Sequence, residues 1–163
     1  MSTPVYHELC FQQNCYNTYF QGLPDQLLNL GVRYDIESPI DEEKMLEACR
    51  LTGKRLPFMS ARIHKKDDGE QLLYFSDEEP GNIGFLDLTD KTDDDVAELL
   101  YEYNTTPFPN DHFDTQLYKF SLLRLRDGKH TLYFCAHHII MDGFSMMFAS
   151  RYVFETYVAL QAK

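Results

Sequence analysis

Apolar residues recur with the spacing of β-strands in the first half of the chain. Residues 32–36 alternate Val, Tyr and Ile with charged residues, which is the period of a half-buried strand. Residues 58–64 and 72–75 also have strand-like composition. The Asp68-Gly69 pair between them is a strong turn signal, so we expect an antiparallel hairpin.

A second hairpin is predicted later in the chain. Residues 117–125 and 131–138 are two β-rich runs, and residues 126–129 connect them with an Asp-Gly pair. The second run is apolar on both faces, which is typical of a strand covered on both sides. We therefore expect it to lie in the centre of a sheet.

Helical spacing indicates three helices. Asp41 can cap a first helix that Gly53 is positioned to end. Thr92 can cap a second helix over residues 93–103, whose acidic first turn complements the helix dipole. A third helix is expected over residues 144–161.

The order of these elements predicts an α+β fold. Helices alternate with a mostly antiparallel sheet and are expected to pack on it in layers. Residues 1–30 are aromatic-rich without clean periodicity, and we expect a loop there with a short helix around residues 24–30. At 163 residues, without repeats or a linker, the chain fits a single domain over residues 1–163.

Charge and hydropathy narrow the class of protein. A net charge of −11 repels nucleic acid and anionic membrane surfaces, so neither is an expected partner. No apolar run is long enough to span a bilayer, and no secretion signal precedes the first strand. We expect a cytoplasmic protein in which the cysteines are free thiols; they are Cys10, Cys15, Cys49 and Cys135.

The candidate chemistry lies where the central strand meets the last helix. His137 and His138 are adjacent, and Asp142 and Gly143 follow at a short interval. Successive strand residues face opposite sides, so the two histidines do not share one task and are a poor pair of ligands for one metal ion. The segment from Gly143 to Met147 lacks the second glycine of a hydrolase nucleophile elbow.

This pattern resembles the H-H-x-x-x-D-G signature of the condensation domains of nonribosomal peptide synthetases, within the superfamily of chloramphenicol acetyltransferase. The signature corresponds to residues 137–143. The hairpin before it, the helix after it, and residues 38–41 with the first helix are also similar to that family. The resemblance implies a chloramphenicol-acetyltransferase-like lobe, with helices packed on a mostly antiparallel sheet.

The resemblance also implies a role for each motif residue. His138 corresponds to the catalytic histidine, as general base or positioning group, and His137 is a motif residue. An imidazole that titrates near neutrality suits either task. Asp142 would be structural, in an ion pair with an arginine that we expect to be Arg62, because residues 55–63 resemble the family segment R-H-x-x-L-R-T-R-F. Gly143 would allow a tight turn, and its amide could stabilise an oxyanion.

The implied reaction is acyl transfer without an acyl-enzyme intermediate. The donor would be a thioester on the phosphopantetheine of a carrier protein or on CoA, the acceptor an amine or hydroxyl, and no cofactor would be bound. Family members have two lobes with the active site between them, so we expect this chain to be the N-terminal lobe and inactive without the C-terminal lobe. Ser60 departs from the family arginine. The alternative is a non-catalytic binding module for a carrier protein or a partner enzyme.

Overall fold

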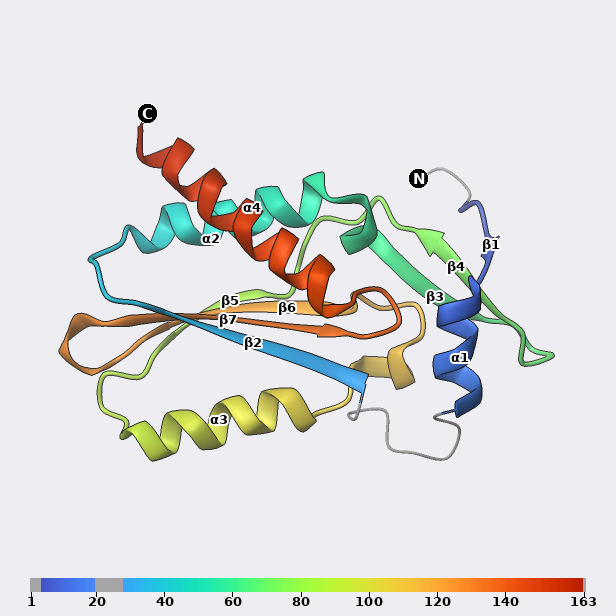
Figure 1. Cartoon of the computed structure of the whole chain (residues 1–163), viewed down its shortest axis with the longest axis horizontal. Coiled ribbons are helices and arrows are strands. Elements are labelled where there is room, and N and C mark those ends of the chain that lie inside the picture. The colour runs from blue at the N-terminus through green and yellow to red at the C-terminus, as the bar shows by residue number, and fades with distance from the viewer. Residues whose placement is uncertain (1–3, 20–27, 163) are drawn as a thin grey trace.

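Two β-sheets and four α-helices make up the described part of the chain, residues 4–19 and 28–162 of the computed structural model (Figure 1). The strands are β1 (His7–Glu8), β2 (Asn29–Ile36), β3 (Ala61–Lys65), β4 (Gln71–Phe75), β5 (Ile83–Asp87), β6 (Tyr118–Arg124) and β7 (His130–His137). The helices are α1 (Phe11–Tyr19), α2 (Glu42–Arg55), α3 (Asp93–Thr105) and α4 (Gly143–Gln161).

The larger sheet has the strand order β2-β7-β6-β5. β7 is antiparallel to both of its neighbours, and β5 is parallel to β6. A smaller antiparallel sheet has the order β1-β4-β3, with β3 and β4 forming the first predicted hairpin. Every residue of β7 is buried, which confirms the prediction of a central strand. The fold is therefore α+β with a mostly antiparallel sheet, as expected.

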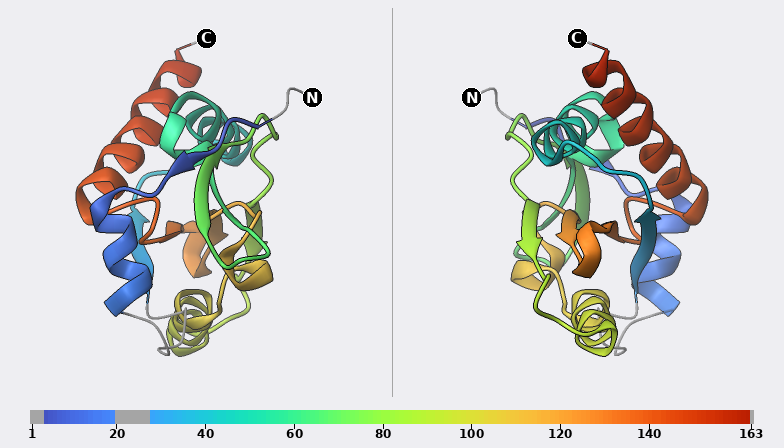
Figure 2. Two further views of the ribbon diagram at one scale, coloured as in Figure 1. Left: turned by 90° about the vertical axis from the view of Figure 1, so that its right-hand side faces the viewer. Right: turned by 90° about the vertical axis from the view of Figure 1, so that its left-hand side faces the viewer.

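Helices cover both faces of the larger sheet. α2 and α4 lie on one face and α3 lies on the other, as the views along the sheet show (Figure 2). The main core fills the space under α2 and α4, and its buried residues are Met45, Ala48, Cys49, Leu56, Met59, Tyr118, Phe120, Leu122, Leu132, Phe134, Ala136, Met141, Met146, Ala149 and Val153. A smaller cluster of Leu88, Val96 and Leu123 packs beneath α3.

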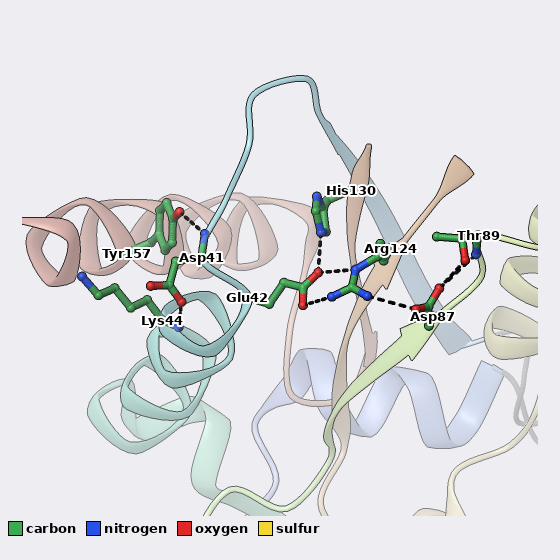
Figure 3. Close-up of polar contacts among 8 residues, drawn as sticks. All are labelled: Asp41, Glu42, Lys44, Asp87, Thr89, Arg124, His130 and Tyr157. Carbon is green, nitrogen blue, oxygen red and sulfur yellow. Dashed lines mark hydrogen bonds and ion pairs between the residues drawn. The ribbon is translucent and has the colours of Figure 1, made fainter. Parts of the chain in front are cut away.

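A charged network fixes α2 to the far end of the sheet (Figure 3). Glu42, at the start of α2, accepts hydrogen bonds from Arg124 Nε at 2.7 Å and Nη2 at 2.5 Å. His130 Nε2 lies 2.7 Å from Glu42 Oε1, the oxygen that also accepts from Arg124 Nε, and Arg124 Nη1 donates to Asp87 at 3.0 Å. The Arg124 guanidinium beside it lowers the pKa of the Glu42 carboxyl. The network joins α2 to β5, β6 and β7.

Three expectations about element boundaries were wrong. Residues 58–60, expected to begin a strand, belong to a 3₁₀ helix over Pro57–Ser60 that precedes β3. A helix lies at Phe11–Tyr19, whereas Leu30, which we expected to end a helix, pairs within β2; residues 24–27 lie outside the described part. Gly53 does not end α2, which continues to Arg55. A Cβ at Gly53 would stand 2.3 Å from the hydroxyl of the buried Tyr118. The glycine therefore allows close packing of α2 on β6.

Candidate functional site

The paired histidines lie at the end of the central strand. β7 ends at His137, and a short turn through Met141 leads to α4, which begins at Gly143. The His138 amide donates to the Leu28 carbonyl at 2.7 Å, and the Ile140 amide donates to the His137 carbonyl at 3.2 Å. These backbone bonds hold the turn against the entry to β2, so both imidazoles leave the sheet at one defined position.

His137 faces the interior on the α3 side of the sheet. It is 1% exposed, and its ring stacks on His112 with centroids 4.8 Å apart and meets the edge of Phe108. Its Nδ1 accepts a hydrogen bond from the Ile139 amide at 3.2 Å. Burial, with lesser contributions from His112 and His138, lowers the pKa of His137 to about 3. This imidazole is therefore neutral near pH 7 and holds the turn in place.

His138 occupies a different environment, as the alternation of strand side chains predicts. It is partly exposed and lies against α1. Its Nε2 lies 3.2 Å from the hydroxyl of Tyr16, and the two rings are tilted by 36° with centroids 4.5 Å apart. Its Nδ1 is buried and makes no hydrogen bond to any residue that the structure describes. Nε2 is thus the ring nitrogen that makes a hydrogen bond to a described residue.

Asp142 is the cap of α4 and does not pair with Arg62. Its Oδ1 accepts from the Ser145 amide and from the Ser145 hydroxyl, both at 2.7 Å, and the side chain is exposed. The backbone bond from Ser145 lowers the pKa of the Asp142 carboxyl. An exposed carboxylate with two donors has no need of a buried counter-charge, which explains why the expected ion pair is not formed here.

Arg62 is nevertheless buried, at 2% exposure. Its Nη1 donates to the Ala61 carbonyl at 3.1 Å and to that of Met59 at 3.4 Å, and its Nη2 lies 3.8 Å from Glu78. Loss of hydration lowers the pKa of the guanidinium. Its Nε finds no partner among the described residues. Arg62 therefore stabilises the start of β3 rather than the turn of the motif.

Gly143 begins α4 with open space in front of it. A Cβ at this position would meet nothing within 4 Å, and the backbone does not adopt a left-handed conformation. The local fold therefore does not require glycine here. Gly143 is the first residue of a long helix, where the backbone amides have no acceptor within the helix, as an oxyanion role requires.

The cysteines are free thiols, as predicted. Burial raises the pKa of the Cys49 thiol to about 12 and that of the Cys135 thiol to about 11, so both are poor nucleophiles at neutral pH. Within residues 4–19 and 28–162, no cluster of three or more His, Cys, Asp or Glu is arranged to hold a metal ion. None of the described helices is long and apolar enough to cross a membrane.

Comparison with known sequences identifies the family. Residues 25–163 match the profile of the Condensation domain family. The chain belongs to the condensation-domain family. The N-(5-amino-5-carboxypentanoyl)-L-cysteinyl-D-valine synthase of Amycolatopsis lactamdurans is 29% identical over 130 residues, which cover 77% of this chain and 4% of the synthase. Surfactin synthase subunit 1 of Bacillus subtilis (strain 168) is 28% identical over 123 residues, which cover 74% of this chain and 3% of that subunit.

Solved condensation domains share the fold. The first condensation domain of the calcium-dependent antibiotic synthetase, in complex with a substrate analogue, aligns with a TM-score of 0.84 at 24% identity, over 97% of this chain and 38% of that chain. A mutant of the starter condensation domain of rhizomide synthetase, in complex with C8-CoA, aligns with a TM-score of 0.80 at 22% identity. The alignment covers 96% of this chain and 36% of that chain. These likenesses confirm the chloramphenicol-acetyltransferase-like lobe. The chain spans well under half of either solved chain.

The sequence reasoning missed the contact between this condensation-domain motif and the N-terminal residues. Tyr16 and His138 are 122 residues apart, and Gln13 of the same helix donates to the Ile139 carbonyl at 3.0 Å. The stacking of His112 on His137 was also not foreseen. The one available signal was the density of aromatic residues near the N-terminus, which indicated packing but gave no position for it.

Proposed function

We propose that this chain is the N-terminal lobe of a condensation domain that joins an acyl group, delivered as a thioester, to an amine or hydroxyl acceptor. The observation that carries the proposal is His138, which is partly exposed directly after the central strand, near the amino end of α4. Of its two ring nitrogens, only Nδ1 is buried without a partner among the described residues. The two named sequence relatives are a cysteinyl-D-valine synthase and a surfactin synthase subunit, which supports amide formation with carrier-bound substrates. The C8-CoA complex of the rhizomide domain supports a phosphopantetheine-type donor.

In this reaction His138 is the general base. The acceptor nitrogen or oxygen attacks the thioester carbonyl, and the imidazole takes up the proton that the acceptor loses. The Gly143 amide, at the positive end of the α4 dipole, is placed to donate to the oxyanion that develops on the carbonyl oxygen. The thiol leaves directly, so no acyl-enzyme forms.

The surface beside the motif fits an incomplete active site. Phe144, Met147 and Phe148 lie on the first turns of α4 and are 80%, 65% and 52% exposed. Large apolar side chains grouped in this way mark a surface that a partner or a substrate covers. A C-terminal lobe that supplies the opposite wall of the active site would cover them, and the isolated chain would then be inactive.

The test compares His138→Ala with wild type in the longest polypeptide that its gene encodes around these residues, and in the 163-residue chain by itself. Acyl transfer is followed by mass spectrometry, from CoA-bound and carrier-bound thioesters to amine and alcohol acceptors. The control is His7→Ala, which removes an exposed histidine from β1.

We expect His138→Ala to lower turnover by about 10²–10⁴-fold, the usual contribution of a general base. The control should retain activity, and the isolated chain should show none. A folded longer protein with full turnover after His138→Ala would refute the catalytic assignment. The protein would then be a binding module for a carrier protein or a partner enzyme, and carrier-protein binding would be measured next.

A further inference from the structure

The Nε2 atom of His138 lies within hydrogen-bonding distance of a neighbouring side chain, that of Tyr16. Nδ1 is buried without a partner among the residues described, so a base at this position must use Nε2. The Tyr16 hydroxyl lies 3.2 Å from Nε2, within hydrogen-bonding distance, and the centroids of the two rings are 4.5 Å apart. An imidazole nitrogen has one lone pair in the ring plane. An acceptor substrate and Tyr16 therefore compete for the same position on His138.

α1, which carries Tyr16, is held by contacts that precede that residue in the chain. Gln13 Nε2 donates to the Ile139 carbonyl at 3.0 Å, which ties α1 to the turn of the motif. Leu9, just before the helix, is buried in a cluster with Ile63, Leu117 and Ile139. Preceding these residues, β1 is paired with β4. Because these contacts hold α1 in place, we expect Tyr16 to stay beside His138 during the reaction.

A phenol in this position can pass a proton on. Its oxygen accepts one hydrogen bond while its hydrogen is donated to another group. Loss of hydration, together with the Asp142 carboxylate, raises the pKa of Tyr16. The side chain is therefore an uncharged phenol near pH 7, with a hydrogen available for Nε2.

We propose that Tyr16 is a catalytic residue that relays the acceptor's proton to His138. The inference rests on the proposed function. As the acceptor nitrogen forms its bond to the thioester carbonyl carbon, its N–H proton moves to the Tyr16 oxygen, and the Tyr16 hydrogen moves to Nε2. When the C–S bond breaks, the same path returns one proton to the leaving thiolate. Both side chains end as they began, and the acceptor has lost the proton that the thiol gains.

The charge that the relay creates has a counter-charge nearby. Proton transfer makes His138 an imidazolium, and His138 and the Asp142 carboxylate interact electrostatically. Asp142 also acts on Tyr16. Its negative charge lies near the positive charge that the relay creates, and the hydrogen bonds that its side chain accepts at 2.7 Å come from Ser145.

The decisive variant is Tyr16→Phe, which removes the hydroxyl and keeps the ring that contacts His138. The matched control is Tyr157→Phe, which removes a hydroxyl that hydrogen-bonds to Asp41 and Gln161 on the far end of α4. In the longest polypeptide that contains this chain, we expect Tyr16→Phe to lower kcat at least about tenfold with little change in KM. The control should behave as wild type.

The solvent isotope effect separates a relay from a purely structural role. Two protons move together in wild type, so kcat should depend on the deuterium fraction of the solvent along a curve. The residual activity of Tyr16→Phe should follow a straight line. An unchanged or increased kcat in Tyr16→Phe would overturn the relay, because it would mean that Tyr16 covers His138 and obstructs it.

A measurement independent of turnover tests the contact itself. In the 163-residue chain labelled with ¹⁵N at histidine, Tyr16→Phe should shift the Nε2 resonance of His138 and leave that of His130 in place. An unchanged His138 resonance overturns the relay even where His138→Ala abolishes turnover, and the proposed function then stands. A shifted resonance together with full turnover in His138→Ala overturns both.

Discussion

Replacing His137 with Asn should remove a specific pH dependence from the stability of the domain. The ring is 1% exposed, and burial lowers the pKa of His137 to about 3. An Asn side chain can offer an oxygen near the position of Nδ1, which accepts from the Ile139 amide, and it does not titrate. The variant therefore separates the titration of the imidazole from its hydrogen bond.

The sign and size of the effect follow from proton linkage. In the unfolded chain a histidine has a pKa near 6.5. Below that pH the histidine of the unfolded state is therefore protonated, whereas His137 of the folded state remains neutral. The folded state thus loses stability as the pH falls from 6.5 toward the folded pKa of about 3. Between pH 7 and pH 5 the free energy of unfolding should drop by about 2 kcal/mol from this group.

Urea unfolding at pH 7, 6 and 5 measures this drop as the difference between wild type and His137→Asn. The control is Ile139→Val, which alters the neighbouring apolar cluster without removing a titrating group. The difference in free energy of unfolding between Ile139→Val and wild type should be independent of pH. If the difference for His137→Asn also stays constant within about 0.5 kcal/mol, the imidazole is not held neutral by burial and the reasoning fails.

Two other substitutions test the packing and the cap. Gly53→Ala should destabilise by about 1–2 kcal/mol in urea unfolding, because the new Cβ would lie 2.3 Å from the Tyr118 hydroxyl. In a Tyr118→Phe background the same change should cost less, because only the contacts with Pro80 at 3.0 and 3.1 Å remain. Equal effects in both backgrounds would contradict the close contact with the hydroxyl. Asp142→Ala should cost about 0.5–2 kcal/mol by loss of the bonds from Ser145, and Asp142→Ser should recover most of it. A double-mutant cycle with Arg62→Met should give coupling below about 0.5 kcal/mol, whereas a larger value would indicate the ion pair.

Elements with a clean hydrophobic period were predicted from the sequence. β7 is apolar on both faces and is buried throughout, and α3 begins at the cap that Thr92 provides with Asp95 in a reciprocal capping box. In each case the local pattern and the tertiary environment agree, because a face buried by neighbours must also be apolar at a fixed spacing.

β5 and α1 were not predicted, because their placement depends on distant partners. β5 is short, contains Gly84 and pairs with β6 at the edge of the sheet. α1 has no acidic residue in its first turn and a polar sequence, and Gln13 and Tyr16 anchor it to the turn of the motif. A pattern read along the chain contains no trace of such contacts.

The candidate site was predicted in part. The position of the motif at the end of a central strand, and the opposite environments of His137 and His138, follow from the period of a strand. The pair expected between Asp142 and Arg62 is absent, because a carboxylate at the start of a helix binds the free amides there. An aspartate at this position can pair with an arginine or cap the helix. The choice depends on geometry that the motif alone does not contain.

The pairing of β2 with β7 sets a demanding order of assembly. Ile36 of β2 pairs with His130 of β7. β2 therefore cannot pair until β7 has been synthesised, which happens much later. At about 5–20 residues per second, the ribosome needs roughly 5–20 s to make the intervening segment. During that interval the nascent strand exposes unpaired backbone groups that other chains can capture. Slow, concentration-sensitive folding is therefore built into the connectivity that brings the two histidines to the end of the sheet.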